Sequence, residues 1–337
     1  MATLYISRED GMLGKQGEAL CYKKGRTGAG EAFPARLIDD VVIFGYGSVS
    51  TPAIHLMLDN NIPLHFIDEK GLYKGCITSG RGRGYAIKRL QMNAALDRDM
   101  SAGIARSLIK SKLNNQLATL RRWLNRNRAD DIALYHACED LKKILNYLPA
   151  CEDIDTIRGV EGAGAAVYFS VFGRLLRNPW FFRGRNKRPP KDPVNAMLSF
   201  GYTLLLAHVT SAVAIAGLDP CVGFIHPEFR GRPSMALDLM EEYRSQVIDR
   251  LVLSITNQML LKTENFLPTK EGGVYMDGEA RKTFLNCYLK RMNERVKNKT
   301  TGSVSTYRNH IFASACYLVS HLRTGKEYLP FEPSDHG

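Results

Sequence analysis

The chain has 337 residues, 45% of them hydrophobic, which is enough for one large core or two domains. Lys and Arg number 46 against 34 Asp and Glu, so the formal net charge of +12 favours association with polyanions, although many basic proteins are merely soluble. The seven cysteines are scattered without a C-x-x-C pair, and the amino terminus becomes charged by residue 8. These features argue against a disulfide framework, a zinc site and an export signal, and we expect a reduced, cytoplasmic protein.

Short β-branched or aromatic runs separated by Gly, Asn, Asp and Pro predict strands in the first part of the chain. They lie at residues 3–7, 19–24, 40–47, 63–68 and 73–78, and one short helix is expected near residues 51–60. We therefore predict a small β-domain over residues 1–82, with a sandwich as one arrangement. The Gly-Arg-Gly-Arg-Gly run at 80–84 fits either an RNA-binding element or a flexible turn between domains, and its single copy favours the turn.

From about residue 85 the apolar residues recur with a helical period. Between residues 104 and 124, Leu and Ile repeat every three to five positions, and bases that include Lys112 fill positions between them. One face should pack, while the bases are either solvated or contact phosphate. Further helices are predicted at 130–147, 155–179, 193–217, 234–262, 278–297 and 306–324, with a β-hairpin within 261–276. The predicted fold class is α+β, with the β-domain followed by a larger α-helical domain at residues 83–337 that carries the hairpin insertion.

Residues 197–218 carry no formal charge over 22 positions, which is long enough for a transmembrane helix. Ser, Thr, Tyr and His interrupt this run, and Leu-Asp-Pro ends it. We therefore predict a fully buried central helix and no association with a membrane.

Three acids, one histidine and one arginine are the strongest candidates for chemistry. Glu161 lies among small residues near a predicted helix start, where it is either a surface glutamate favoured by the helix dipole or a carboxylate that a ligand can approach. His226 ends an apolar run and, taken alone, would more often be structural. Asp238 and Glu241 follow at i and i+3 of a predicted helix, with Arg244 one turn further, so a metal, Arg244 or water would relieve their repulsion. Carboxylates with one imidazole suit Mg²⁺ or Mn²⁺, the ions that activate phosphodiester chemistry.

A basic, Pro-stiffened loop follows Trp180 and two Phe residues. Its bases suit a grip on the DNA phosphate backbone, although a solvated linker would have a similar composition. The candidate DNA-binding residues are Arg183, Arg185, Lys187, Arg188 and Lys191.

Four segments, taken in this order, resemble the CRISPR-associated endonuclease and integrase of spacer acquisition, the first of the numbered Cas protein families. The resemblance spans nearly the whole chain. The segments are Gly159-Val-Glu-Gly-Ala-Gly-Ala-Ala-Val-Tyr-Phe, Arg188-Pro-Pro-Lys-Asp-Pro-Val-Asn-Ala-Met-Leu-Ser-Phe-Gly-Tyr, Gly217-Leu-Asp-Pro-Cys-Val-Gly-Phe-Ile-His and Ser234-Met-Ala-Leu-Asp-Leu-Met-Glu-Glu-Tyr-Arg.

The resemblance implies an amino-terminal dimerisation domain and a carboxy-terminal catalytic and DNA-binding domain. It further implies a homodimer, two copies of which are bridged by a dimer of a small second adaptation protein into a heterohexamer. On the family's motif, Glu161, His226 and Glu241 fall at metal-ligand positions, Asp238 at a supporting acidic position and Arg244 at a basic position close to the site. Some branches of the family have Asp and Lys in place of Glu241 and Arg244, which leaves the preferred metal open.

The implied function is metal-dependent insertion of short double-stranded DNA pieces into a CRISPR array, as part of antiviral defence. A DNA 3′-hydroxyl would attack a phosphodiester at the repeat boundary, while the metal lowers the pKa of that hydroxyl. His226 would be a metal ligand, a proton shuttle or both. Two alternatives remain: a general nuclease for branched DNA repair or junctions outside CRISPR, and a structural DNA-binding protein without catalysis, which would have no reason to keep the three ligands together.

Overall fold

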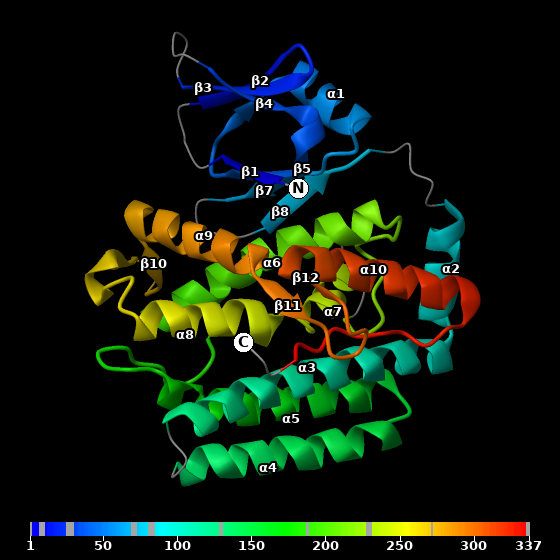
Figure 1. The fold of residues 1–337 in the computed structure, drawn as a ribbon, viewed down its shortest axis with the longest axis vertical. Coiled ribbons are helices and arrows are strands. Elements are labelled where there is room, and N and C mark those ends of the chain that lie inside the picture. The colour runs from blue at the N-terminus through cyan, green and yellow to red at the C-terminus, as the bar shows by residue number, and fades with distance from the viewer. Residues whose placement is uncertain are drawn as a thin grey trace. The chain divides into compact units, whose positions relative to one another are not determined.

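The computed structural model describes residues 2–6, 11–24, 30–68, 73–79, 85–127, 131–186, 189–226, 231–270 and 272–334. The chain divides into two compact units, Met1–Tyr85 and Ala86–Gly337 (Figure 1). The first unit is rich in strands and the second is mainly helical, so the predicted α+β class is confirmed. The predicted boundary between residues 82 and 83, like the Gly-Arg-Gly-Arg-Gly run, lies outside the described residues, and the dimerisation and catalytic roles of the two parts stay predictions.

The described residues of the first unit form two four-stranded sheets. The elements are β1 (Ala2–Ile6), β2 (Gly11–Gln16), β3 (Ala19–Lys24), β4 (Glu31–Pro34), η1 (Ala35–Leu37), β5 (Ile38–Phe44), β6 (Ser48–Val49), α1 (Thr51–Asp59), β7 (Leu64–Ile67) and β8 (Tyr73–Ile77). In one sheet β1, β5 and β7 pair in parallel and β8 is antiparallel to β7. In the other sheet β3 pairs antiparallel with β2 and β4, and β6 runs parallel to β2.

Both sheets and helix α1 contribute to one apolar core. Leu13 and Leu20 come from the β2–β3 hairpin, Val41 and Leu64 from the other sheet, and Met57 from α1. The five predicted strands and the predicted helix are all present within a few residues of their expected ends. Three further strands, β2, β4 and β6, were not predicted, because runs such as Gly-Met-Leu-Gly-Lys-Gln contain few of the residues that favour strands.

The second unit is built mainly from helices, with two short hairpins. Its elements are α2 (Tyr85–Leu96), α3 (Arg98–Asn127), α4 (Ile132–Tyr147), η2 (Leu148–Ala150), α5 (Ile154–Phe172), η3 (Gly173–Leu175), α6 (Pro193–Ile215), α7 (Ser234–Met240), the π-helical turn η4 (Arg244–Asp249), α8 (Arg250–Asn257), η5 (Thr263–Asn265), β9 (Phe266–Pro268), β10 (Val274–Met276), α9 (Gly278–Asn293), β11 (Arg295–Lys297), β12 (Val304–Thr306) and α10 (Tyr307–Thr324). The β9–β10 pair is the predicted hairpin insertion.

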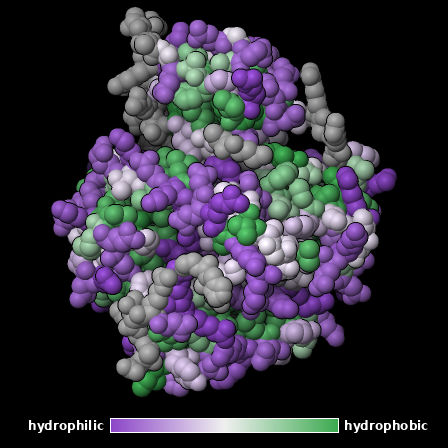
Figure 2. All heavy atoms as spheres, viewed as in Figure 1, coloured by the Kyte–Doolittle hydropathy of each residue, from purple (hydrophilic) through white to green (hydrophobic). Residues whose placement is uncertain are grey.

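Helix α6 is the central helix that the sequence predicted. Asp192 caps its first turn by accepting the backbone N–H of Asn195, and Pro193 occupies the first helical position. It is the one helix among the described residues that is long and apolar enough to cross a membrane, but 67% of its most apolar window is buried inside the structure. At Gly201 an added Cβ would lie 2.7 Å from Ile248, so only glycine allows this close packing. Over the helical unit, the face shown in Figure 2 is mostly hydrophilic.

Three predicted helices were too long. The helix expected at 155–179 ends at Phe172 and is followed by one 3-10 turn, Gly173–Leu175. The helix expected at 234–262 is interrupted after Met240 and continues through η4 into α8, because a π-turn inserts an extra residue into the hydrogen-bond ladder. The helix expected at 278–297 ends at Asn293, and residues 295–297 pair instead with β12. Gly302, with a φ of 72°, provides the left-handed turn residue for this hairpin.

Candidate active site

Several elements of the second unit place titratable side chains around one point. Helix α3 packs against α5 and α7, which brings together residues that are far apart in the sequence. The side chains are Lys112 from α3, Glu161 from α5, His226 from the segment before α7, Asp238 from α7, Glu241 directly after α7 and Arg244 from η4.

Asp238 organises the turn that carries His226. Its carboxylate is fully buried and accepts the backbone N–H groups of Phe224, Ile225 and His226 at 2.6, 2.9 and 3.0 Å. It also lies 2.6 Å from Nδ1 of His226, which fixes the proton on that nitrogen and makes Nε2 the ring atom that can bind a ligand. At Gly223 an added Cβ would lie 2.8 Å from Oδ2 of Asp238, so the turn requires a residue without a side chain.

Glu241 is buried and negatively charged. Its Oε1 lies 3.0 Å from Nη2 of Arg244, and its Oε2 lies 2.7 Å from Nζ of Lys112. Burial alone would raise the pKa of this carboxyl, but the charges of Arg244, Lys112 and His226 outweigh burial and lower the pKa to about 2.

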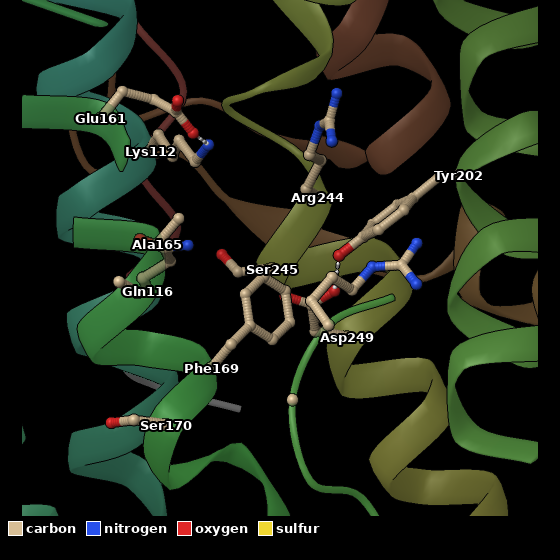
Figure 3. Close-up of a pocket in the computed structure, with 13 residues that line it drawn as sticks. Lys112, Gln116, Glu161, Ala165, Phe169, Ser170, Tyr202, Arg244, Ser245 and Asp249 are labelled. Atoms are coloured by element: carbon tan, nitrogen blue, oxygen red, sulfur yellow. Dashed lines mark hydrogen bonds and ion pairs between the residues drawn. The ribbon is translucent and has the colours of Figure 1, made fainter. Parts of the chain in front are cut away.

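Glu161 shares Lys112 with Glu241. Its Oε1 forms an ion pair with the same ammonium group, as Figure 3 shows. Asp153 caps α5, so Glu161 lies about two turns inside the helix and not near its start, as the sequence had suggested. The surface glutamate favoured by a helix dipole is therefore the wrong alternative.

Lys112 was missed as a site residue by sequence reasoning, which grouped it with the bases between the apolar positions of α3. That interpretation is wrong at this position, because the side chain of Lys112 is only 6% exposed. A signal was present in the sequence: Lys112 follows Leu108 by four residues and Ile109 by three, and both are fully buried. A lysine on the packed face of a helix requires an acidic partner.

The two acids on the α7 face do not share one cation. Asp238 is hydrogen-bonded by the turn and His226, whereas the charge of Glu241 is balanced by ion pairs with Arg244 and Lys112. The sequence left a metal, Arg244 or water as ways to relieve the repulsion between these acids. In the structure Arg244 and a second base, Lys112, balance the charge of Glu241.

The donor set fits an oxygen-preferring divalent cation. As the side chains stand, no group of three or more His, Cys, Asp and Glu residues within the described ranges is close enough to hold a metal ion. Two observations nevertheless favour the fit. Glu161 and Glu241 already share one positively charged group, the ammonium of Lys112. In addition, Oε2 of Glu241 is buried without a hydrogen bond of good geometry among the described residues. The assignment of Glu161, His226 and Glu241 as metal ligands stays a prediction.

A pocket of about 490 Å³ extends from Glu161 and Lys112 along η4 (Figure 3). At its other end Tyr202 donates a hydrogen bond to Asp249 at 2.5 Å. Burial raises the pKa of Asp249 to about 6, although the Tyr202 and Tyr168 hydroxyls and two arginines oppose the shift. The lining residues are Lys112, Gln116, Glu161, Ala165, Ala166, Phe169, Ser170, Gly184, Arg185, Tyr202, Arg244, Ser245 and Asp249.

The predicted DNA-binding loop does not present its bases as one set. Arg185 lines the pocket, donates to Asn195 Oδ1 at 2.7 Å and to Ser199 Oγ at 3.1 Å, and is therefore held by the fold. Arg183 and Lys191 are exposed, and Arg183 stacks over the Phe181 ring. Lys187 and Arg188 lie outside the described residues, and the DNA-binding role of the whole loop stays a prediction.

Comparison with known proteins identifies the family. The sequence model described as CRISPR associated protein Cas1 matches residues 4–290. The chain is 35% identical over 337 residues to the CRISPR-associated endonuclease Cas1 2 of Rhodospirillum rubrum, and 97% of each chain is covered. A solved casposase bound to integration product has a TM-score of 0.86 at 25% identity, covering 98% of this chain and 93% of that one.

A chain of a solved Cas6-RT-Cas1–Cas2 complex has the same fold, with a TM-score of 0.85 at 24% identity. That match covers 100% of this chain and 36% of the other. The resemblance seen in the four sequence segments is thus confirmed, and the chain belongs to the CRISPR-associated Cas1 family.

Proposed function

We propose that this protein is a metal-dependent DNA endonuclease and integrase that inserts short DNA pieces into a CRISPR array during adaptation. The observation that carries the proposal is that Glu161 from α5 and Glu241, directly after α7, meet at one shared cation, the ammonium group of Lys112. Such a set of hard ligands on a chain of the Cas1 family supports phosphodiester chemistry.

Glu161, His226 and Glu241 would hold Mg²⁺ or Mn²⁺, and the ion would lower the pKa of the attacking 3′-hydroxyl and neutralise charge on the phosphoryl oxygens. Asp238 keeps the proton on Nδ1 of His226 and so presents Nε2 to the site. Arg244 holds Oε1 of Glu241 and faces the pocket, where its remaining N–H groups are placed to bind a phosphate oxygen. His226 remains available as a proton shuttle, a role that is separable from metal binding only by experiment.

We further propose double-stranded DNA, a second copy of the chain and the small second adaptation protein as partners. The casposase relative carries integration product in its solved form, and the related chain of known structure occurs together with Cas2. Both support a role in DNA insertion within an assembly.

The test is reconstitution of the protein and its adaptation partner with a labelled DNA duplex and a repeat-containing plasmid. We expect insertion of the duplex at the repeat, loss of insertion in EDTA, and recovery with Mn²⁺ or Mg²⁺. Insertion that is indifferent to chelation would contradict the metal-dependent mechanism. Cleavage of branched DNA without insertion at the repeat would favour a junction-processing nuclease instead.

A further inference from the structure

Lys112 occupies the position between the two acids that the proposed function assigns to the metal. Its Nζ lies 2.7 Å from Oε2 of Glu241 and forms an ion pair with Glu161, while Arg244 holds the other oxygen of Glu241. The three side chains of this bridge come from α3, α5 and the end of α7. We propose that Lys112 is an internal counter-cation that stabilises the metal-free site, competes with the divalent ion, and must leave at least one carboxylate before that ion binds.

Burial makes this lysine necessary for the metal-free fold. The side chains of Lys112 and Glu241 are 6% and 4% exposed, so neither charge is well hydrated. A buried charge that loses its partner destabilises a protein strongly, because no water replaces the lost interaction. Without the ammonium, Glu161 and Glu241 would also repel each other across the space that it fills.

The same charge opposes metal binding. Two carboxylates, Glu161 and Glu241, already face two bases, Lys112 and Arg244, so the group is balanced before any ion arrives. A divalent ion that bound beside an unmoved ammonium would be repelled by it at short range. Since both metal and ammonium need Oε2 of Glu241 and the Glu161 carboxylate, binding of one weakens binding of the other.

DNA supplies the negative charge that resolves this competition. Lys112, Glu161 and Arg244 all line the pocket, so a phosphate group placed there would receive a displaced ammonium. Metal and DNA should therefore bind cooperatively, and the coupling should depend on Lys112. The role rests on the proposed metal site, but it makes predictions that need no catalytic turnover.

The test compares Lys112→Met with Lys143→Met. Lys143 also pairs with one acid, Asp140 at 3.0 Å, but both side chains are largely exposed, so the control removes the same charge outside the site. Thermal unfolding in EDTA, Mn²⁺ affinity by electron paramagnetic resonance, and Mn²⁺ affinity with a short 3′-overhang DNA duplex are measured for both variants and the wild type.

We expect Lys112→Met to lower the melting temperature of the metal-free protein by roughly 5 °C or more, and Mn²⁺ to restore it. Its Mn²⁺ affinity without DNA should increase by roughly tenfold or more. The DNA-dependent gain in Mn²⁺ affinity should be smaller than in the wild type, while Lys143→Met should match the wild type in all three measurements.

A variant that folds only in Mn²⁺ would support the proposal equally. To keep the test independent of metal, Lys112→Met is also combined with Glu161→Gln, which removes one acid and one base together and should recover much of the lost metal-free stability. No recovery would overturn the role of Lys112 as a counter-cation.

Weaker or unchanged Mn²⁺ binding by Lys112→Met would overturn the competition while leaving the proposed metal site intact. Absence of Mn²⁺ binding by the wild type, with and without DNA, would overturn both.

Discussion

Glu241 and Glu242 are adjacent in the sequence and both are buried, yet they face two different regions of the second unit. Glu241 faces Lys112 and Arg244, two residues that line the pocket, and the charges of Arg244, Lys112 and His226 lower its pKa to about 2 despite burial. Glu242 faces the core, where burial raises its pKa to about 8 because its partners are uncharged donors. The comparison teaches that the partners, and not the degree of burial, decide which carboxyl is ionised at neutral pH.

The core region uses Glu242 to hold the end of the chain. Its carboxyl accepts from the Tyr328 hydroxyl at 2.7 Å, the Phe331 backbone N–H at 3.0 Å and the Ser314 hydroxyl at 3.3 Å. The ring of Phe331 stacks on Tyr243 with centroids 4.7 Å apart. A protonated acid suits this dry region, whereas a carboxylate suits the region of Glu241, where it faces the two bases Lys112 and Arg244.

The largest expected effect is on the rate of strand transfer, when any of the three proposed metal ligands is removed. Glu161→Ala, His226→Ala and Glu241→Ala should each lower the rate of strand transfer by roughly 10²–10³-fold, because each removes a donor from one shared catalytic device. The losses should be non-additive in double variants. Strand transfer and DNA binding are measured in parallel, with exposed Glu152→Ala as the matched control. DNA binding that falls together with transfer would show that the acids act on the fold and not on the chemistry.

A sharper test makes the same substitution on both sides of the comparison. Glu241→Gln removes a needed negative charge and should lower Mn²⁺ affinity and strand transfer by roughly 10–100-fold. Glu242→Gln resembles the protonated acid and should leave both within about twofold of the wild type. Both are measured at pH 7 on the same DNA. Equal losses for the two variants would break the distinction between an ionised and a neutral acid.

The sequence predicted the charged side of this comparison better than the neutral side. Glu161, His226 and Glu241 stand in the segments that resemble the Cas1 family. The uncharged run at residues 197–218, interrupted by polar residues, predicted a buried helix, and 67% of the most apolar window of α6 is buried. Lys112 was missed because a lysine among other bases resembles a solvated residue, and only the packing of α3 on α5 and α7 reveals its acids. Glu242 could not be assigned a charge, because its partners lie more than 70 residues away and the π-turn η4 was not predictable from an apolar period.

Substitution of Asp238 should reduce Mn²⁺ affinity and strand transfer less than substitution of the three proposed metal ligands does. Asp238→Asn keeps an oxygen for the backbone N–H groups of Phe224 and Ile225 but loses the charge that orients His226. We expect roughly a tenfold loss of Mn²⁺ affinity and of strand transfer, because outer partners tune a ligand without replacing it. Metal titration and transfer assays check this at constant pH. A loss as large as that of His226→Ala would mean that Asp238 binds the ion itself.

The smallest expected effect is on how the free energy of unfolding depends on pH, and it comes from Glu242 in the core. Glu242 has a folded pKa of about 8 against the ordinary glutamate value of 4.5, so the stability that it contributes is full below about pH 4.5 and is lost as pH rises towards 8. The slope from this group is about 1.4 kcal/mol per pH unit at most across that window. Glu242→Gln should remove this slope, whereas Glu241→Gln should not, because the Glu241 pKa of about 2 places its titration below pH 4.5. Urea unfolding of the three proteins at pH 5, 6.5 and 8 measures the difference. A wild-type slope that persists in Glu242→Gln would mean that other groups, and not the neutral acid of the core, govern stability over this range.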